Sequence, residues 1–209
     1  MDVGSRPWVR VKICGMTRLE DAQLAVLRGA DAVGFIFFKS STRHIAPAEA
    51  KKIIAQLPPL VQTVGVFVNE TADRVNRIAD TCRLDAVQLH GEESPAFCRR
   101  IRKKVIKAIR VKDLESLHSM EDYNVSAFLL DSYSDKEQGG TGKTFDWNLV
   151  HRAKKLGTII MAGGLTPSNV HQAVRQVRPF GVDVCSGVEK SPGIKDPAKI
   201  DAFMTAVRI

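Results

Sequence analysis

Residues 9–14 set a pattern that the rest of the chain repeats. Apolar and polar side chains alternate here with the period of a β-strand. One face carries Val9, Val11 and Ile13, and the other carries Arg10, Lys12 and Cys14. Gly15 then ends the strand, and the pattern predicts a helix from Arg18 with Thr17 as its N-cap. A polar residue such as Cys14 at the carboxyl end of a strand is where α/β proteins place their chemistry.

The alternation of strand and helix continues along the chain. Apolar runs predict further strands at residues 32–37, 63–68, 86–89, 105–109, 127–130, 158–162 and 181–185. Stripes at helical spacing and capping residues predict the helices that follow these strands. They are expected from residue 47, at 71–82, 94–103, about 112–120, about 147–156 and 170–177, and around residues 200–207. A long polar loop is expected at residues 132–144.

These elements amount to eight strand–helix units in one chain. Strands that are apolar on both faces are typical of a buried parallel sheet. Eight such units close into a (β/α)8 TIM barrel, for which ~200 residues is the lower end of the range. An open doubly wound sheet calls for fewer strands or a nucleotide-type glycine fingerprint, which residues 14–17 are not. We therefore predict one α/β barrel domain at residues 8–209, preceded by a disordered extension at residues 1–7.

Composition narrows the choice of partners. The 209 residues include 31 Lys and Arg against 23 Asp and Glu, a formal net charge of +8, and 44% are apolar. This charge suits nucleic acid or an anionic small molecule. No basic motif interleaved with aromatic residues occurs, and the basic run at residues 99–104 is interpreted as a solvated helix face. No apolar run reaches ~18 residues. We expect a small-molecule ligand, with no nucleic acid and no membrane partner.

The cysteines and histidines bear on metal binding and on location. Four cysteines are scattered along the chain, with no CxxC pair and no zinc spacing with the five histidines. No metal site is therefore predicted. The start of the chain lacks the features of a signal peptide. Together these observations favour a reducing, cytoplasmic location.

Polar residues stand at the ends of several predicted strands, which meet at one rim in a barrel. They are Cys14, Arg43, His90, Asp131 and Asp183. Three have ordinary explanations: Cys14 as a small buried hydrophobe, His90 as a structural histidine, and Asp131 as a cap for the next turn. Asp183 lies inside an apolar strand, so its carboxylate requires hydrogen-bond partners or a ligand. These residues bring a thiol, two carboxylates, an imidazole and a guanidinium to one rim. Such a set indicates a reaction site rather than packing.

Two glycine-rich turns follow the seventh and eighth predicted strands. The first contains Gly163 and Gly164 and precedes a helix, and the second contains Ser186 and Gly187. Barrels often bind phosphate with the loops at these two places, where backbone N–H groups form an anion cradle. Glycine that serves only a tight turn is the alternative explanation. The positions of both turns favour phosphate binding by these four residues.

With these motifs in view, the chain resembles the phosphoribosylanthranilate isomerases of tryptophan biosynthesis over nearly its whole length. The matching stretches are residues 12–17, 34–37, 41–45, 64–67, 87–91, 130–132, 139–147, 162–165, 181–184 and 186–189. Cys185 departs from the family, which usually has serine there. We expect this departure to alter packing beside the phosphate turn rather than the chemistry.

The resemblance implies an intramolecular aldose–ketose isomerase. Its reaction is an Amadori rearrangement of N-(5'-phosphoribosyl)anthranilate to 1-(2-carboxyphenylamino)-1-deoxyribulose 5-phosphate. An acid protonates the ribose ring oxygen and opens the sugar to a Schiff base, and a base then removes the proton from C2'. The resemblance implies no cofactor, because the iminium formed on ring opening is its own electron sink.

The resemblance also implies roles for the rim residues. It places the base at Cys14 and the acid at Asp131, with Arg43 at the anthranilate carboxylate and His90 and Asp183 along the sugar. A thiolate serves as a base near neutral pH if positive charge is close, and Lys12 shares the strand face of the thiol. The acid must hold its proton, so a partly desolvated site is expected for its carboxyl group.

Two other functions stay open from the sequence. A bifunctional relative that also isomerises the histidine-pathway aminoaldose is implied to have aspartate in place of Cys14, so the thiol argues against it. A phosphate-binding or scaffold protein with a degenerate rim is opposed by the complete set of rim residues and both glycine turns. The oligomeric state is left between a monomer and a weak homodimer.

Overall fold

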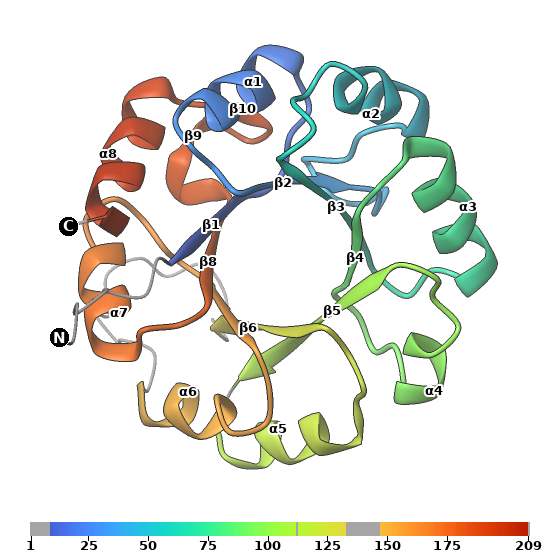
Figure 1. The fold of residues 1–209 in the computed structure, drawn as a ribbon, viewed down its shortest axis with the longest axis vertical. Coiled ribbons are helices and arrows are strands. Elements are labelled where there is room, and N and C mark those ends of the chain that lie inside the picture. Colours follow the sequence, from blue (N-terminus) through green and yellow to red (C-terminus); the bar gives the residue numbers. More distant parts are fainter. Residues whose placement is uncertain (1–8, 112, 133–146, 209) are drawn as a thin grey trace, which may run out of the picture.

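Eight parallel strands form a closed barrel in this computed structural model, which describes residues 9–111, 113–132 and 147–208 (Figure 1). The strands pair in chain order, and β1 closes the ring by pairing with β8. They are β1 (Arg10–Ile13), β2 (Ala32–Ile36), β3 (Gln62–Phe67), β4 (Ala86–Leu89), β5 (Lys104–Val111), β6 (Ala127–Ser132), β7 (Ile159–Ala162) and β8 (Gly181–Val184). The predicted (β/α)8 barrel is confirmed. The extension predicted at residues 1–7 and all but the first residue of the loop predicted at 132–144 lie outside the described residues and stand untested, whereas Ser132 belongs to β6.

Helices surround the strands and cover the outer wall of the barrel (Figure 1). They are α1 (Leu19–Leu27), α2 (Pro47–Ile54), α3 (Ala72–Cys82), α4 (Pro95–Cys98), α5 (Glu115–His118), the 3-10 turn η1 (Ser119–Asp122), α6 (Trp147–Ala153), α7 (Val170–Val177) and α8 (Pro197–Arg208). Local sequence sets several ends: Pro47 opens α2, and the Thr71 hydroxyl of α3 accepts from the Arg74 N–H. Arg83 closes α3 in the left-handed region, with φ 56°.

Two predictions about helices are wrong. Arg18, not Thr17, precedes α1, and the hydroxyl of Thr17 donates instead to the carbonyl of Gly193 at 2.5 Å. The helix predicted at residues 94–103 ends at Cys98. Beyond it, the Asn76 side chain of α3 donates to the Arg100 carbonyl at 3.0 Å and accepts from the Arg102 N–H at 3.0 Å. These two bonds replace the helical ones, so the basic run forms an exposed turn rather than a helix face.

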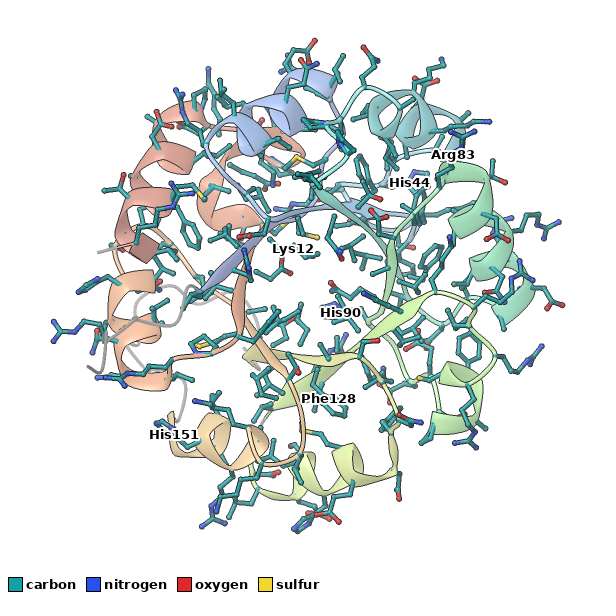
Figure 2. All side chains as sticks on the ribbon, in the orientation of Figure 1. Lys12, His44, Arg83, His90, Phe128 and His151 are labelled. Carbon is teal, nitrogen blue, oxygen red and sulfur yellow. The ribbon has the colours of Figure 1, made fainter. Side chains whose placement is uncertain are left out.

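The barrel has an apolar layer on each side of its wall. Outward side chains of the strands pack against the helices in the main core, which includes Val11, Ile13, Phe35, Leu89, Leu130 and Val184. A second cluster fills the barrel itself. It consists of Val64, Ala86, Ile106, Ala108, Ala127, Leu129, Ile160 and Ala162. The alternation predicted for residues 9–14 is therefore correct, because Val11 and Ile13 face the helices and Lys12 faces the interior (Figure 2).

A short hairpin that the sequence pattern does not predict follows β8. The 3-10 turn η2 (Ser186–Val188) leads into β9 (Glu189–Ser191), which pairs in antiparallel fashion with β10 (Ile194–Lys195). Figure 1 shows β9 and β10 beside α1 and close to β1. The hairpin brings Glu189 and Lys195, both buried, to the strand ends described next.

Candidate active site

Cys14 follows β1 at the rim where the strands end, and its residue is only 5% exposed. A glycine on the neighbouring strand makes room for it: a Cβ placed on Gly34 of β2 meets the Cys14 Sγ at 2.7 Å and the Lys12 Nζ at 3.1 Å. The thiol and the ammonium thus share the space that a side chain at position 34 would occupy. The sequence places Cys14 and Lys12 on one face of the strand, and the structure brings both to the barrel interior.

A buried ion pair crosses from β1 to β8. The Lys12 Nζ donates to Asp183 Oδ1 at 2.9 Å, with side-chain exposures of 5% and 8%. Burial raises the pKa of Asp183 to about 7, although the Lys12 ammonium acts in the opposite direction. Burial lowers the pKa of Lys12, but Asp183 and Cys14 outweigh it and raise that pKa above its ordinary value. Asp183 therefore has the partner that its position in an apolar strand requires.

The surroundings of Cys14 favour its thiolate. A side-chain hydrogen bond from Cys185 is the largest cause that lowers the pKa of Cys14; burial opposes it, and the charges of Lys12 and Lys195 add to the lowering. The pKa of Cys14 lies well below 9.0 as a result. The pKa of Cys185 moves upward, because it donates its proton toward Cys14 and is itself desolvated. Of the two thiols, Cys14 is therefore the one whose ionised form is favoured.

A second ion-pair network lies beneath the thiol and was not anticipated from the sequence. The Lys195 ammonium is fully buried and donates to the Cys14 carbonyl at 2.5 Å, to the Cys185 carbonyl at 3.2 Å and to Glu189 Oε1 at 3.0 Å. One ammonium therefore ties β1, β8 and the hairpin together. Its charge contributes to the lowered pKa of Cys14.

Arg43 reaches this network from the loop after β2. Its Nε lies 2.9 Å from Glu189 Oε1, and its second terminal nitrogen lies 2.6 Å from Glu189 Oε2, which is a fork-shaped pair. The Arg43 side chain is 23% exposed, whereas that of Glu189 is 4% exposed. The carboxylate thus fixes one edge of the guanidinium. The other terminal nitrogen lies 3.4 Å from the Thr42 hydroxyl.

His90 and Asp131 meet on the other side of the barrel. The His90 Nε2 lies 3.1 Å from Asp131 Oδ2, and the amide nitrogen of Gln88 lies 2.9 Å from His90 Nδ1. The side chains of His90 and Asp131 are 23% and 31% exposed. The Gln88 Oε1 is buried and has no hydrogen-bond partner among the described residues. Asp131 is thus partly shielded from solvent, and its contact with His90 is one that the sequence did not predict.

A third buried ion pair supports the loop that carries His90. The Lys107 Nζ donates to Glu93 Oε2 at 2.9 Å and to the Gly91 carbonyl at 2.6 Å. Glu93 in turn accepts from the backbone N–H groups of Asn69 and Gly91, at 2.8 and 2.9 Å. These bonds tie the loops after β3 and β4 together. A lysine inside the apolar run at residues 105–109 was the sequence signal that could have revealed this clamp.

The two glycine turns lie after β7 and β8, as predicted. Gly163 and Gly164 have φ of 84° and 62°, a region that favours glycine, and a Cβ on Gly164 would meet nothing within 4 Å. A Cβ on Gly187 would overlap the Leu165 carbonyl oxygen, so Gly187 lets the two turns pack together. Gly163 and Gly164 donate none of the backbone hydrogen bonds that the described residues make outside helices and strands. Backbone N–H groups in such a turn can serve as donors to an anion.

The described residues hold no group of three or more His, Cys, Asp or Glu side chains that could bind a metal ion. Within the same residues, no helix has the length and apolar character that crossing a membrane demands.

Comparison with known proteins gives one consistent family. The family model described as N-(5'phosphoribosyl)anthranilate (PRA) isomerase matches residues 11–206. The N-(5'-phosphoribosyl)anthranilate isomerase of Citrifermentans bemidjiense is 60% identical over 191 residues, which cover 91% of this chain and 93% of the relative. That of Geotalea uraniireducens is 56% identical over 195 residues, 93% of this chain and 96% of the relative.

Solved structures agree with this result. The phosphoribosyl anthranilate isomerase of Thermotoga maritima superposes with a TM-score of 0.88 at 46% identity, covering 96% of this chain and 98% of that one. A structure of the same kind of enzyme in complex with reduced 1-(o-carboxyphenylamino)-1-deoxyribulose 5-phosphate gives a TM-score of 0.86 at 43% identity, with the same coverage.

Proposed function

The chain belongs to the N-(5'-phosphoribosyl)anthranilate isomerase family, and on this premise we propose which of its residues carry out the reaction. The protein is an isomerase of tryptophan biosynthesis that converts N-(5'-phosphoribosyl)anthranilate into 1-(2-carboxyphenylamino)-1-deoxyribulose 5-phosphate. We propose that Asp131 is the general acid that opens the ribose ring and that Cys14 is the general base that takes the C2' proton.

The single observation that carries the assignment of the base is the charge environment of Cys14. Lys12 and Lys195 stand beside it, and together with the Cys185 thiol they lower its pKa well below 9.0. A thiolate that is present at neutral pH is a competent base. When it accepts the C2' proton, the electrons of the broken C–H bond move toward the iminium. The sulfur becomes a neutral thiol and must later release that proton.

His90 supports the acid as a positioning residue. With the Gln88 amide nitrogen donating to Nδ1, the Nε2–H faces Asp131 and suits the carboxylate form. If the amide is turned by half a rotation, Gln88 Oε1 accepts from Nδ1–H, and Nε2 accepts from a protonated Asp131. The buried and unpartnered Oε1 gains a donor in that second arrangement. The Gln88–His90 pair thus accommodates both protonation states through which Asp131 passes.

The remaining rim residues bind the two ends of the substrate. We assign the anthranilate carboxylate to Arg43, whose guanidinium is already oriented by Glu189. Asp183 lines the sugar beside Lys12. The phosphate lies at the N–H groups of Gly163, Gly164, Ser186 and Gly187. A phosphorylated compound is bound by a relative in its solved complex, which supports a phosphorylated small molecule as the substrate of this chain.

The test separates base from acid by single-turnover rates measured from the fluorescence of phosphoribosylanthranilate. Cys14→Ser and Asp131→Asn are each expected to lower the rate by about 10²–10⁴-fold, the usual scale for general acid–base catalysis. Serine is close in size to cysteine, but its hydroxyl is too weak an acid to supply an anion. Cys98→Ser, at a buried thiol outside the rim, is the matched control and should keep its rate. A Cys14→Ser rate equal to that of this control overturns the assignment of the base.

For the oligomeric state we propose a weak homodimer. A relative from Thermotoga maritima is described as dimeric. At the opposite mouth of the barrel from the site, Leu60 is 96% exposed and Phe180 is 56% exposed, and both border a hollow in the barrel floor. The net charge of +8 opposes tight self-association. Sedimentation equilibrium should show dimers whose share rises with protein concentration. Leu60→Glu should abolish these dimers, whereas the control Leu114→Glu, at the site end of the barrel, should not. A monomer at all concentrations contradicts this proposal.

We also propose a cytoplasmic location. The supporting observation is that the four cysteines are scattered along the sequence without a CxxC pair. This pattern is not that of the disulfide frameworks found in oxidising compartments. Fractionation of cells, with detection of the protein and of marker enzymes, tests the location.

A further inference from the structure

Cys14 and Cys185 are brought together by the pairing of the first and last barrel strands. Their preceding residues, Ile13 and Val184, are direct partners, and the Cys14 N–H donates to the Val184 carbonyl at 2.8 Å. The Lys195 ammonium binds the carbonyls of both cysteines. Paired strands lie about 4.8 Å apart, and the Cα atoms of a disulfide lie about 4.4–6.8 Å apart. Cys14 and Cys185 are the next residues after the last paired positions, Ile13 and Val184, so the strand spacing favours a separation that a disulfide can bridge.

The two sulfur atoms face the same small space. The two thiols are close enough for each to shift the pKa of the other, and the Cys185 Sγ also lies 3.9 Å from Glu189 Oε1. A Cβ placed on Gly15 would lie 2.9 Å from the Cys185 Sγ, so the sulfur of Cys185 occupies the room that this glycine leaves beside Cys14. Cys14 is buried and Cys185 is partly exposed, which leaves a route for a small reagent from the rim.

The two thiols of the pair differ in their reactivity toward an oxidant. Cys14 favours the thiolate, which is the nucleophilic form, and Cys185 keeps its proton. Burial raises the pKa of the other two cysteines, Cys82 and Cys98, so they are less reactive. An oxidant that reaches this protein should therefore meet Cys14 first, with a second thiol already in contact with it.

We propose that Cys14 and Cys185 form a reversible disulfide when the protein meets a hydroperoxide, with Cys14 as the attacking thiol and Cys185 as the resolving one. The Cys14 thiolate attacks the peroxide oxygen, so that an S–O bond forms, the O–O bond breaks and hydroxide leaves. The Cys185 sulfur then displaces the sulfenic oxygen, and the S–S bond forms as the S–O bond breaks. Two electrons pass from the thiols to hydrogen peroxide, and their two hydrogens leave in two molecules of water.

The disulfide has two consequences. It removes the thiolate, so it blocks isomerisation, and this consequence rests on the proposed role of Cys14 as the base. It also protects the sulfur, because a sulfenic acid without a resolving thiol proceeds to sulfinic acid, which dithiothreitol does not reduce. Cys185 thereby makes oxidation of the site reversible.

The experiment compares the purified wild type with Cys185→Ser, Cys185→Ala and Cys98→Ala. Each protein is treated with hydrogen peroxide, and one half is then reduced with dithiothreitol. Free thiols are alkylated, and peptide mass spectrometry identifies the state of Cys14. Isomerase activity is measured at each stage relative to the untreated sample of the same variant, which separates the effect of oxidation from any effect of the substitution itself.

Wild type and Cys98→Ala should yield a peptide pair that joins Cys14 to Cys185 and has lost two hydrogens, with activity lost and then restored by dithiothreitol. Both Cys185 variants should instead carry sulfinic acid at Cys14 and stay inactive after reduction. The proposal is overturned if no such peptide pair forms in the wild type, or if the Cys185 variants recover as fully as the wild type. A disulfide that forms without loss of activity leaves this proposal standing and refutes the role of Cys14 as the base.

Discussion

Replacement of Gly34 by alanine tests the position of the thiol directly. The new Cβ meets the Cys14 Sγ at 2.7 Å, the Lys12 Nζ at 3.1 Å and the Cys14 Cα at 3.2 Å. Non-bonded heavy atoms of this kind pack at about 3.5–4.0 Å, so the sulfur must retreat by about 1 Å. Gly34 is not among the residues with positive φ, so alanine brings no backbone strain of its own. The whole effect of Gly34→Ala therefore comes from this overlap.

The overlap has separate costs in stability and in rate. Overpacking of a filled site costs about 1–3 kcal/mol in the free energy of unfolding. A displacement of about 1 Å at a reacting group costs about 10²-fold in rate. We therefore expect Gly34→Ala to lower kcat by about two orders of magnitude while the protein remains folded at the assay temperature. The rate loss should exceed what the loss of folded protein explains.

Gly65→Ala on the next strand is the matched control. Its Cβ points to the outer face of the barrel, where it contacts Leu84 and meets the Phe67 ring at 2.9 Å. The substitution is the same and the packing cost is comparable, but Cys14 is not touched. Urea unfolding measures stability, and saturating fluorescence assays well below both unfolding midpoints measure kcat. Equal kcat in the two variants would show that the position of the Cys14 sulfur does not limit the reaction.

Three further outcomes follow from the site. Alkylation of Cys14 by iodoacetamide should persist to much lower pH than alkylation of Cys98, because the pKa of Cys14 is lowered and that of Cys98 is raised. Lys12→Met should shift the pH at which Cys14 alkylation is lost to a higher value. An unchanged pH profile in this variant contradicts the role of Lys12. Arg43→Ala should weaken binding of the reduced product analogue by about 1.5–3 kcal/mol and leave binding of inorganic phosphate unchanged; an unaltered Kd for the analogue removes Arg43 from the site. Gly164→Val should weaken binding of phosphorylated ligands, in calorimetry, more than binding of the same ligands without phosphate, and equal effects on both refute the phosphate assignment.

Much of the fold could be predicted because buried barrel strands appear in the sequence as short apolar or alternating runs. The strand at residues 86–89 was predicted with the bounds that the structure has, and residues 9–14 showed which side chains face inward. Position at a strand end then grouped the rim residues before any contact was known. Family resemblance added roles for them. It did not give their partners, which depend on how segments far apart in the chain pack together.

The parts that escaped prediction have identifiable physical causes. Helix α4 ends at Cys98 because the Asn76 side chain of α3 forms hydrogen bonds with the backbone of the residues that follow α4. The hairpin β9–β10 is too short for an alternating pattern and carries charged residues that suggest a solvent-exposed loop. Lys195 and Glu189 are buried only because the hairpin packs against the end of β1. No local pattern records that contact.

Charge balance explains why such a network surrounds a thiol. Three cations, Lys12, Lys195 and Arg43, are held here by two carboxylates, those of Asp183 and Glu189. A buried charge is costly without an opposite charge, and the three cations outnumber the two carboxyl groups even when Asp183, whose pKa is raised to about 7, is ionised. A negative charge on Cys14 reduces this excess of positive charge. The buried cations therefore favour the ionised form of Cys14 and lower its pKa, so the packing of this end of the barrel and the acidity of its thiol have one electrostatic origin.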